Sequence, residues 1–244
     1  MKKLLIFLFC ASIASGALAQ KAKIDSVALF ILDRMSNVIG DLVSCSFRVN
    51  ASYDIPDEVN GLVKKHSEHE IYMSGPNKML VNSTGWGGHQ EYWYDGKQLF
   101  YYSYDENNYA VIKAPATTLL TIDSVNKNYE IDFPAADFFY PAFTDDLIES
   151  SDLITLLDDT QVNGTDCYCV LATRKDKRIQ IWISNDAFNL PVKYVIVYLN
   201  LEGYPQYEAT LSDWKVNPNL PTSMFNFMPP PHAVKIRMIS VSGK

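Results

Sequence analysis

Apolar residues recur first at helical spacing and then at a spacing of two. Over residues 24–43, seven apolar side chains lie three or four positions apart, with Asp25 or Ser26 as a cap, which predicts an amphipathic helix. Over residues 45–53, apolar and polar residues alternate without a break, which predicts a half-buried strand. The chain therefore passes directly from a helix into a sheet.

The rest of the pattern predicts two groups of strands separated by a helical insert. Within each group, turn sequences such as Asp95-Gly96 and Asn163-Gly164 separate one strand from the next. The insert holds a helix over residues 117–129 and two short helical pieces around Pro141, and its apolar stripe must pack against the sheet. Strands at this regular spacing indicate one curved antiparallel sheet or barrel. The eleven predicted strands are 45–53, 62–73, 78–83, 89–94, 97–104, 109–113, 155–162, 167–174, 179–183, 192–199 and 207–214.

The segment EYWYDGKQLFYYSY, residues 91–104, predicts a hairpin with aromatic rings on both faces. Asp95-Gly96 supplies the positive φ angles of a tight two-residue turn. Such a turn would place Tyr94 opposite Lys97. A surface hairpin normally has one polar face, so two aromatic faces imply that something covers at least one of them.

The two faces of this hairpin are assigned different roles. The face that is continuous with Leu99 is predicted to be concave, and its tyrosines suit a cavity wall because the ring is apolar while the hydroxyl finds a partner or water. Ordinary core packing is the alternative for the same rings. With inward positions of other strands, the candidate cavity residues are Phe47, Val49, Tyr92, Tyr94, Leu99, Tyr101, Ile179, Ile181 and Ile183. The opposite face carries Trp93, Phe100 and Tyr102, expected as an exposed aromatic strip or packed under a loop such as 85–88.

The N-terminus has the features of a cleaved signal peptide. A positive start and an apolar run precede Ala17-Leu18-Ala19, which provides small residues at the cleavage positions. The residue before Cys10 is too large for a lipid-attachment site, so a lipoprotein is not expected. No later stretch has the roughly 18 apolar residues of a spanning helix. We therefore expect residues 1–19 to be removed and residues 20–244 to form a single domain in the periplasm.

Composition and charge exclude several classes of protein. The chain is 48% hydrophobic and 13% aromatic, enough for a sizeable core. Without Lys2 and Lys3 of the signal peptide, 19 basic residues face 28 acidic residues, a net charge of −9. This charge argues against nucleic acid as a partner and against electrostatic docking on anionic lipid.

Three cysteines remain after the signal peptide, and an odd number leaves one thiol over. Cys167 and Cys169 would point to the same face of a strand, a poor geometry for bonding to each other. A disulfide between Cys45 and either of them is one alternative. Three buried thiols acting as small hydrophobic side chains are the other.

Metal-binding and catalytic patterns are weak in this sequence. His66, Glu68 and Glu70 alternate onto one strand face while His69 falls on the other, and a zinc site needs three or four convergent ligands. A solvated charged edge is the better interpretation, so we expect neither a metal nor another cofactor. We find no Gly-x-Ser-x-Gly motif and no cysteine with a histidine motif, and no catalytic residue is assigned. Asp137 is expected either to cap a helical turn or to titrate inside the cavity.

Several motifs resemble a family of predicted periplasmic proteins of unknown function in the LolA-like lipoprotein-carrier superfamily. They occur in order over residues 22–239 and are ALFILDRMS, WYDGKQLFYYSYDENNYAVIKAP, FPAADFFY, LPVKYVIVY, YEATLSDW and FNFMPPPHAVKI. The resemblance implies an open antiparallel half-barrel of about eleven strands, with helices covering an apolar concave side. In LolA the hollow takes lipoprotein acyl chains, in related proteins other lipids, and in an envelope-stress sensor a regulatory partner; at least one relative is an enzyme. The nearest counterpart of LolA's cavity arginine is Arg48, which is expected on the outer face, so the lipoprotein hand-over role is not transferred.

The sequence thus predicts a non-enzymatic periplasmic protein of a Gram-negative envelope that binds a lipid or another apolar or amphiphilic ligand. The main alternative is a protein-interaction module of envelope stress or assembly that uses the exposed strip, and an enzyme is a third. Neither a membrane span nor a nucleic-acid partner is expected, and the oligomeric state is left open.

Overall fold

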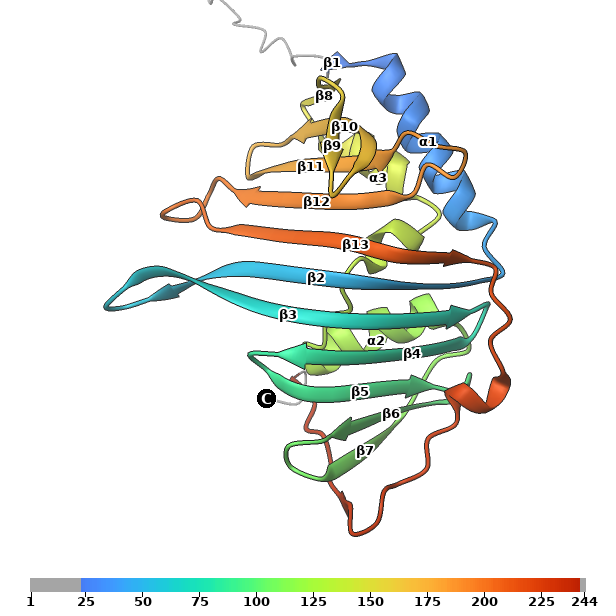
Figure 1. The fold of residues 1–244 in the computed structure, drawn as a ribbon. Coiled ribbons are helices and arrows are strands. Elements are labelled where there is room, and N and C mark those ends of the chain that lie inside the picture. Colours follow the sequence, from blue (N-terminus) through green and yellow to red (C-terminus); the bar gives the residue numbers. More distant parts are fainter. Residues whose placement is uncertain (1–22, 242–244) are drawn as a thin grey trace, which may run out of the picture.

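The computed structural model describes residues 23–241 as one continuous fourteen-stranded sheet with helices on one side (Figure 1). The predicted signal peptide, residues 1–19, lies outside the described residues. Strand order is β1-β8-β10-β11-β12-β13-β2-β3-β4-β5-β6-β7-β14, with β9 paired to β10. All pairs are antiparallel except β1–β8 and β7–β14 at the two edges. The strands are β1 Lys23–Ile24, β2 Ser44–Asp57, β3 Gly61–Ser74, β4 Lys78–Gly85, β5 Gly88–Tyr94, β6 Gln98–Ser103, β7 Asn108–Lys113, β8 Leu153–Leu156, β9 Thr160–Val162, β10 Thr165–Thr173, β11 Lys177–Ser184, β12 Pro191–Tyr198, β13 Gln206–Val216 and β14 Val234–Lys235.

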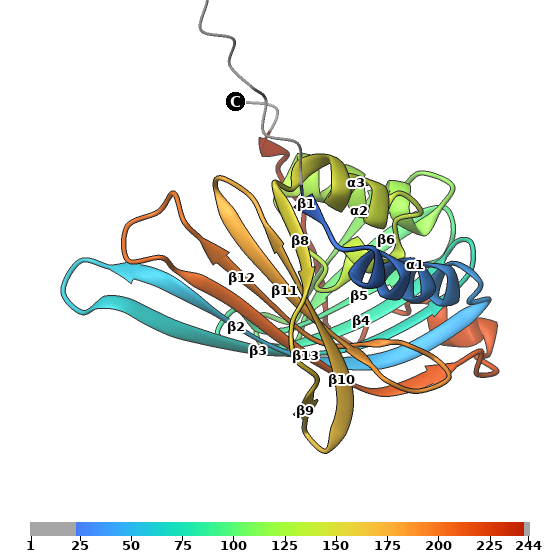
Figure 2. The ribbon, with the colours of Figure 1, turned by 90° about the horizontal axis from the view of Figure 1, so that it is seen from above.

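Apart from η2, the helical elements gather on the concave side of the sheet, and Figure 2 shows the tips of β2–β3 and β12–β13 extending beyond them. Asp25 caps α1 by accepting a hydrogen bond from the Val27 amide at 2.8 Å, as predicted. Thr117 caps α2 in the same way. The helical elements are α1 Ser26–Gly40, α2 Thr118–Tyr129, η1 Ala136–Phe139, α3 Phe143–Ser150 and η2 Thr222–Phe225. The predicted fold, a curved and mainly antiparallel open sheet with helices across its concave side, is confirmed.

The aromatic hairpin has a different register from the one predicted. Tyr94 pairs with Leu99, not with Lys97, because the loop is four residues long. The Asp95 carboxylate closes it by accepting hydrogen bonds at 2.8 Å from the amides of Lys97 and Gln98. The shift is two residues, which equals the side-chain period of a strand, so every ring stays on its predicted face.

A segment at the C-terminus covers the predicted aromatic strip. Residues 217–241, here called the C-terminal strap and drawn in red in Figure 1, pass over the outer face of the sheet near β4–β7 and then pair with the edge strand β7 through β14. Within the strap, Phe225 is buried and Phe227 lies 4.9 Å from the ring of Trp93. The strip is therefore not exposed, because Phe227 also packs on Phe100, Tyr102 and Tyr109.

The three described cysteines are buried free thiols, and the disulfide that we considered is not formed. Cys45 lies on β2, whereas Cys167 and Cys169 lie on β10, with three strands between them in the sheet. Neighbouring strands are about 4.8 Å apart, so the thiols are far beyond disulfide distance along the sheet. Burial raises the pKa of the Cys45 thiol to about 12.

Within residues 23–241, none of the helices is both long enough and apolar enough to cross a membrane.

Candidate functional site

Most of the candidate cavity residues lie in a densely packed part of the concave side. All nine belong to the main apolar core or pack against it, and seven of them are buried. The two half-buried members are Tyr101 and Ile179. We use the name packed part for the inner surface of the sheet that is formed by Phe47, Val49, Ile71, Val81, Tyr92, Tyr94 and Leu99.

Aromatic side chains from the helical insert fill this packed part. Phe139 of η1 stacks on Phe47 at 5.8 Å, and Phe133 meets Tyr92 edge to face at 5.4 Å. On its other side the Phe47 ring stacks on Trp214 at 4.1 Å. The space left between these rings is only about 10 Å³, enough for one water molecule at most. The packed part is a protein core rather than a cavity.

The other part of the concave side is open and holds two larger pockets. The narrow pocket, of about 760 Å³, lies between α3, η1 and the inner face of β11–β12. Its floor is apolar and includes the predicted residues Ile179 and Ile181 together with Ile196. Its mouth carries charges of both signs. These charged residues are Asp123, Asp137, Asp146, Glu149, Arg174 and Lys177.

The wide pocket, of about 1090 Å³, lies where the tips of β2–β3 and β12–β13 extend beyond the helices (Figure 2). Rings of Tyr53, Tyr198 and Tyr207 form part of its wall, with apolar residues such as Leu62 and Leu201. The volumes of both pockets are those of small-molecule sites in proteins. Five carboxylates stand among the lining residues: Asp54, Asp57, Glu58, Asp132 and Glu202.

Residues 132–140, here called the partition segment, separate the two pockets. Asp132 and Pro134 line the wide pocket, whereas Ala135, Asp137, Phe138 and Tyr140 line the narrow pocket. Tyr194 of β12 holds the segment to the sheet: its hydroxyl oxygen accepts a hydrogen bond from the Ala135 amide at 3.2 Å. The same hydroxyl donates to the Tyr207 hydroxyl at 3.2 Å. Burial raises the pKa of Tyr194 well above its ordinary value, so it stays a neutral hydroxyl.

Desolvation shifts the pKa values of two side chains that line the open part, Asp137 and His69. Asp137 reaches the narrow pocket, so of its two predicted roles the structure shows the cavity position; surrounding protein raises its pKa by desolvation, which nearby Lys177 partly offsets. His69 lines the wide pocket between the hydroxyls of Ser67 and Ser83, at 2.9 and 2.7 Å. Burial lowers the pKa of His69 to about 4, and the ring is therefore neutral near pH 7.

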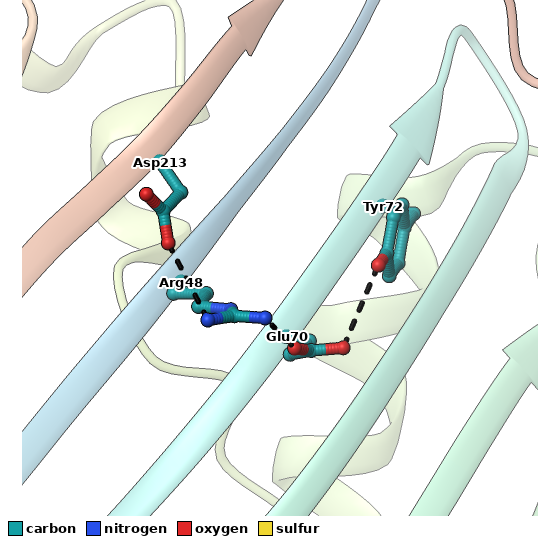
Figure 3. Close-up of polar contacts among 4 residues, drawn as sticks. All are labelled: Arg48, Glu70, Tyr72 and Asp213. Carbon is teal, nitrogen blue, oxygen red and sulfur yellow. Dashed lines mark hydrogen bonds and ion pairs between the residues drawn. The ribbon is translucent and has the colours of Figure 1, made fainter.

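Arg48 lies on the convex face, as expected, and does not enter the hollow. It forms ion pairs with Glu70 at 2.7 Å and Asp213 at 3.5 Å, while Tyr72 donates a hydrogen bond to Glu70 (Figure 3). Because both sides of the ion pairs are more than two-fifths exposed, this network is a surface feature of modest strength. No residue set in the described part of the chain, residues 23–241, brings three or more His, Cys, Asp or Glu side chains together for a metal ion.

The sequence pointed to the correct face of the sheet but not to the open part of it. Ile179 and Ile181 are the predicted residues that reach a large pocket, and Phe47 reaches only the small residual space. Tyr194 and Tyr207 were missed, although they alternate inward in the motifs LPVKYVIVY and YEATLSDW in the same way as Tyr92 and Tyr94. That alternation was the available signal.

Comparisons with known proteins agree with this architecture. Residues 28–239 match the sequence profile of a family described as "Predicted periplasmic protein (DUF2092)". No similar sequence was found among curated proteins. The similarity inferred above from the sequence motifs is confirmed by the family match.

Solved structures resemble this chain at low sequence identity, and the three named below have TM-scores of 0.50 or less. Lipoprotein LppX of Mycobacterium tuberculosis is 12% identical with a TM-score of 0.50, over 80% of this chain and 98% of LppX. An uncharacterized conserved protein of Thermus thermophilus is 12% identical, with a TM-score of 0.49 over 86% of this chain and 99% of that one. A LolA superfamily protein of Nitrosomonas europaea is 12% identical, with a TM-score of 0.35 over 82% and 97%. At these identities the likeness concerns the fold alone.

Proposed function

Because the chain belongs to DUF2092, a family of predicted periplasmic proteins, we propose that it is exported by a cleaved signal peptide and acts as a binding protein in the periplasm. Its ligand is an apolar or amphiphilic molecule, and binding involves no chemical reaction. The mature chain, residues 20–244, acts as a single LolA-like domain. The observation that carries the proposal is the open part of the concave side, with pockets of about 760 and 1090 Å³ on either side of the partition segment.

Burial of apolar surface supplies the binding energy in this proposal. Each methylene group removed from water contributes about 0.8 kcal/mol, part of which offsets the entropy lost on association. The apolar floor of the narrow pocket, Ile179, Ile181 and Ile196, is suited to this because its strands hold it in place before the ligand arrives. The remaining predicted cavity residues act indirectly, as the core that holds the sheet and helices together.

The alternative of a protein-interaction module depended on an exposed aromatic strip. The C-terminal strap occupies that surface through Phe227. A partner could reach the strip only if the strap moved away. The ligand-binding proposal needs no such movement, because its pockets are open in the structure.

A pair of neighbouring substitutions tests the proposal. Ile196→Asp places a carboxylate on the floor of the narrow pocket, where bound apolar ligand would have to desolvate it. Val197→Asp is the matched control, since the next residue of the strand points to the opposite face. Titration with the uncharged fluorescent probe N-phenyl-1-naphthylamine should show at least a tenfold loss of affinity for Ile196→Asp, from a cost of about 2 kcal/mol, and little change for the control.

A second measurement addresses the natural ligand directly. Solvent extraction of protein purified from the periplasm, followed by mass spectrometry, should release a stoichiometric lipid or other amphiphile. Absence of any co-purified ligand, together with no probe binding by the parent protein, would remove the proposal. Equal losses in the two Asp variants would show that the narrow pocket is not the binding surface.

A further inference from the structure

The two pockets differ in the charges that face them. The lining of the narrow pocket includes four carboxylates and also two cations, Arg174 and Lys177. At the wide pocket, the described lining residues include five carboxylates and neither lysine nor arginine. His69, which also lines it, is neutral near pH 7 because burial lowers its pKa to about 4. The field at the mouth of the wide pocket is therefore negative without an opposing charge in the lining.

The five carboxylates of the wide pocket are not equivalent. Asp54 is paired with Lys64 at 2.9 Å, and Asp57 accepts hydrogen bonds from the amides of Val59 and Asn60 at the hairpin tip. These two carboxylates are satisfied by the protein itself. The remaining three are exposed, and two of them, Glu58 and Glu202, have neither a hydrogen bond nor an ion pair within the described residues.

The wall of the wide pocket adds a second, independent feature. Tyr53 and Tyr207 stack with ring centroids 6.5 Å apart, and Tyr198 lines the same pocket. Burial raises the pKa of Tyr198 and of Tyr207, which keeps both phenols neutral. The face of a neutral aromatic ring attracts cations, ammonium groups in particular, and it also packs well against an alkyl chain.

Deepening the proposed function, on which this step rests, we propose that the wide pocket selects an amphiphile with a cationic ammonium head group. The alkyl portion lies along the tyrosine wall and Leu62, and the ammonium group lies at the mouth near Glu58 and Glu202. An anionic head group, such as that of a fatty acid, is repelled at the same position because Lys64 pairs with Asp54, whereas Glu58 and Glu202 have no cation beside them. The carboxylates alone would not define a site; the 1090 Å³ pocket with its aromatic wall does.

Three probes with the same twelve-carbon chain test this selectivity: dodecyltrimethylammonium, uncharged dodecyl maltoside and anionic laurate. Each is titrated by isothermal calorimetry below its micelle concentration, at low ionic strength. We expect the ammonium probe to bind most tightly and laurate most weakly. The advantage of the ammonium probe should decrease with added salt, because the carboxylates at the mouth are exposed and screened.

Two matched double variants locate the selectivity. Glu58→Gln with Glu202→Gln should weaken binding of the ammonium probe by about fivefold while leaving dodecyl maltoside unchanged, since each exposed ion pair contributes up to about 1 kcal/mol. Asp146→Asn with Glu149→Gln removes two exposed carboxylates from the narrow pocket instead and should leave the preference for the ammonium probe over dodecyl maltoside unchanged.

The outcomes separate this inference from the function on which it rests. If none of the three probes binds, the proposed function itself fails. If all bind equally, or laurate binds best, the charge selectivity is wrong although ligand binding stands. A loss of ammonium binding in the narrow-pocket variant, with none in the wide-pocket variant, would overturn the assignment of the cation to the wide pocket.

Discussion

The packed part and the open part of the concave side are built from the same strand pattern and have opposite contents. Leu99 and Tyr94 alternate inward in the packed part and are completely buried. Ile179 and Ile196 alternate inward in the open part and remain half-exposed to a pocket. The strands alone do not explain this difference, because both parts present apolar side chains at every second position.

The covering segments explain it. The partition segment sends Phe133 and Phe139 toward the packed part, where they contact Tyr92 and Phe47. Toward the open part the same stretch presents Asp132 and Asp137, which do not fill apolar space. A hollow in such a sheet is therefore made by what the covering segment leaves unfilled.

The largest expected effect is the difference in unfolding free energy between two truncations of aliphatic side chains, one in the packed part and one in the open part. Leu99→Ala removes a fully buried side chain and should lower the free energy of unfolding by about 3 kcal/mol. Ile179→Ala removes a side chain that borders a pocket, so its cost should be about 1 kcal/mol, because little new cavity is created. Urea unfolding followed by tryptophan fluorescence measures both. Equal losses would mean that the two parts are packed alike.

An intermediate effect is expected at the boundary between the parts. Tyr194→Phe removes the oxygen that accepts from the buried Ala135 amide, leaving that donor unsatisfied at a cost of about 2 kcal/mol. The loss should be accompanied by faster hydrogen exchange of the partition-segment amides, measured by mass spectrometry. Tyr168→Phe serves as a control, since this half-buried tyrosine packs at the edge of the core. Unchanged exchange in Tyr194→Phe would show that the hydroxyl does not hold the segment.

The smallest effect concerns pH and the open part. The unfolded chain protonates His69 near pH 6.5, whereas the folded protein does so only near 4 because the charged ring would lose water. Between these values the unfolded state binds more protons, so stability falls as the pH is lowered. His69→Gln should remove about 1 kcal/mol of the difference in unfolding free energy between pH 7 and pH 5.5. His66→Gln, on the exposed opposite face of β3, should leave the difference unchanged; if it has the same effect, His69 is not the group responsible.

Local patterns were sufficient wherever an element depends on its own residues. The cap of α1, Asp25, was one of the two predicted candidates, and the start of α2 was predicted within one residue, because a helix end is fixed by side chains only two or three residues away. The faces of the aromatic hairpin were also correct, although its register was not. The loop closed by Asp95 is two residues longer than predicted. Because side chains alternate with a period of two, this difference moves no ring to the other face.

The sequence by itself determined the alternation of the strands, the apolar stripes of the helices and the family of the chain. Only the tertiary structure decided which inward face is filled and which is open, because Phe133 and Phe139 reach strands far away in the sequence. It also decided that Phe227, in a proline-rich tail without periodicity, covers the outer aromatic strip. Side-chain direction is set by the local backbone, whereas burial depends on which distant segment packs on that face, and no local pattern encodes the choice.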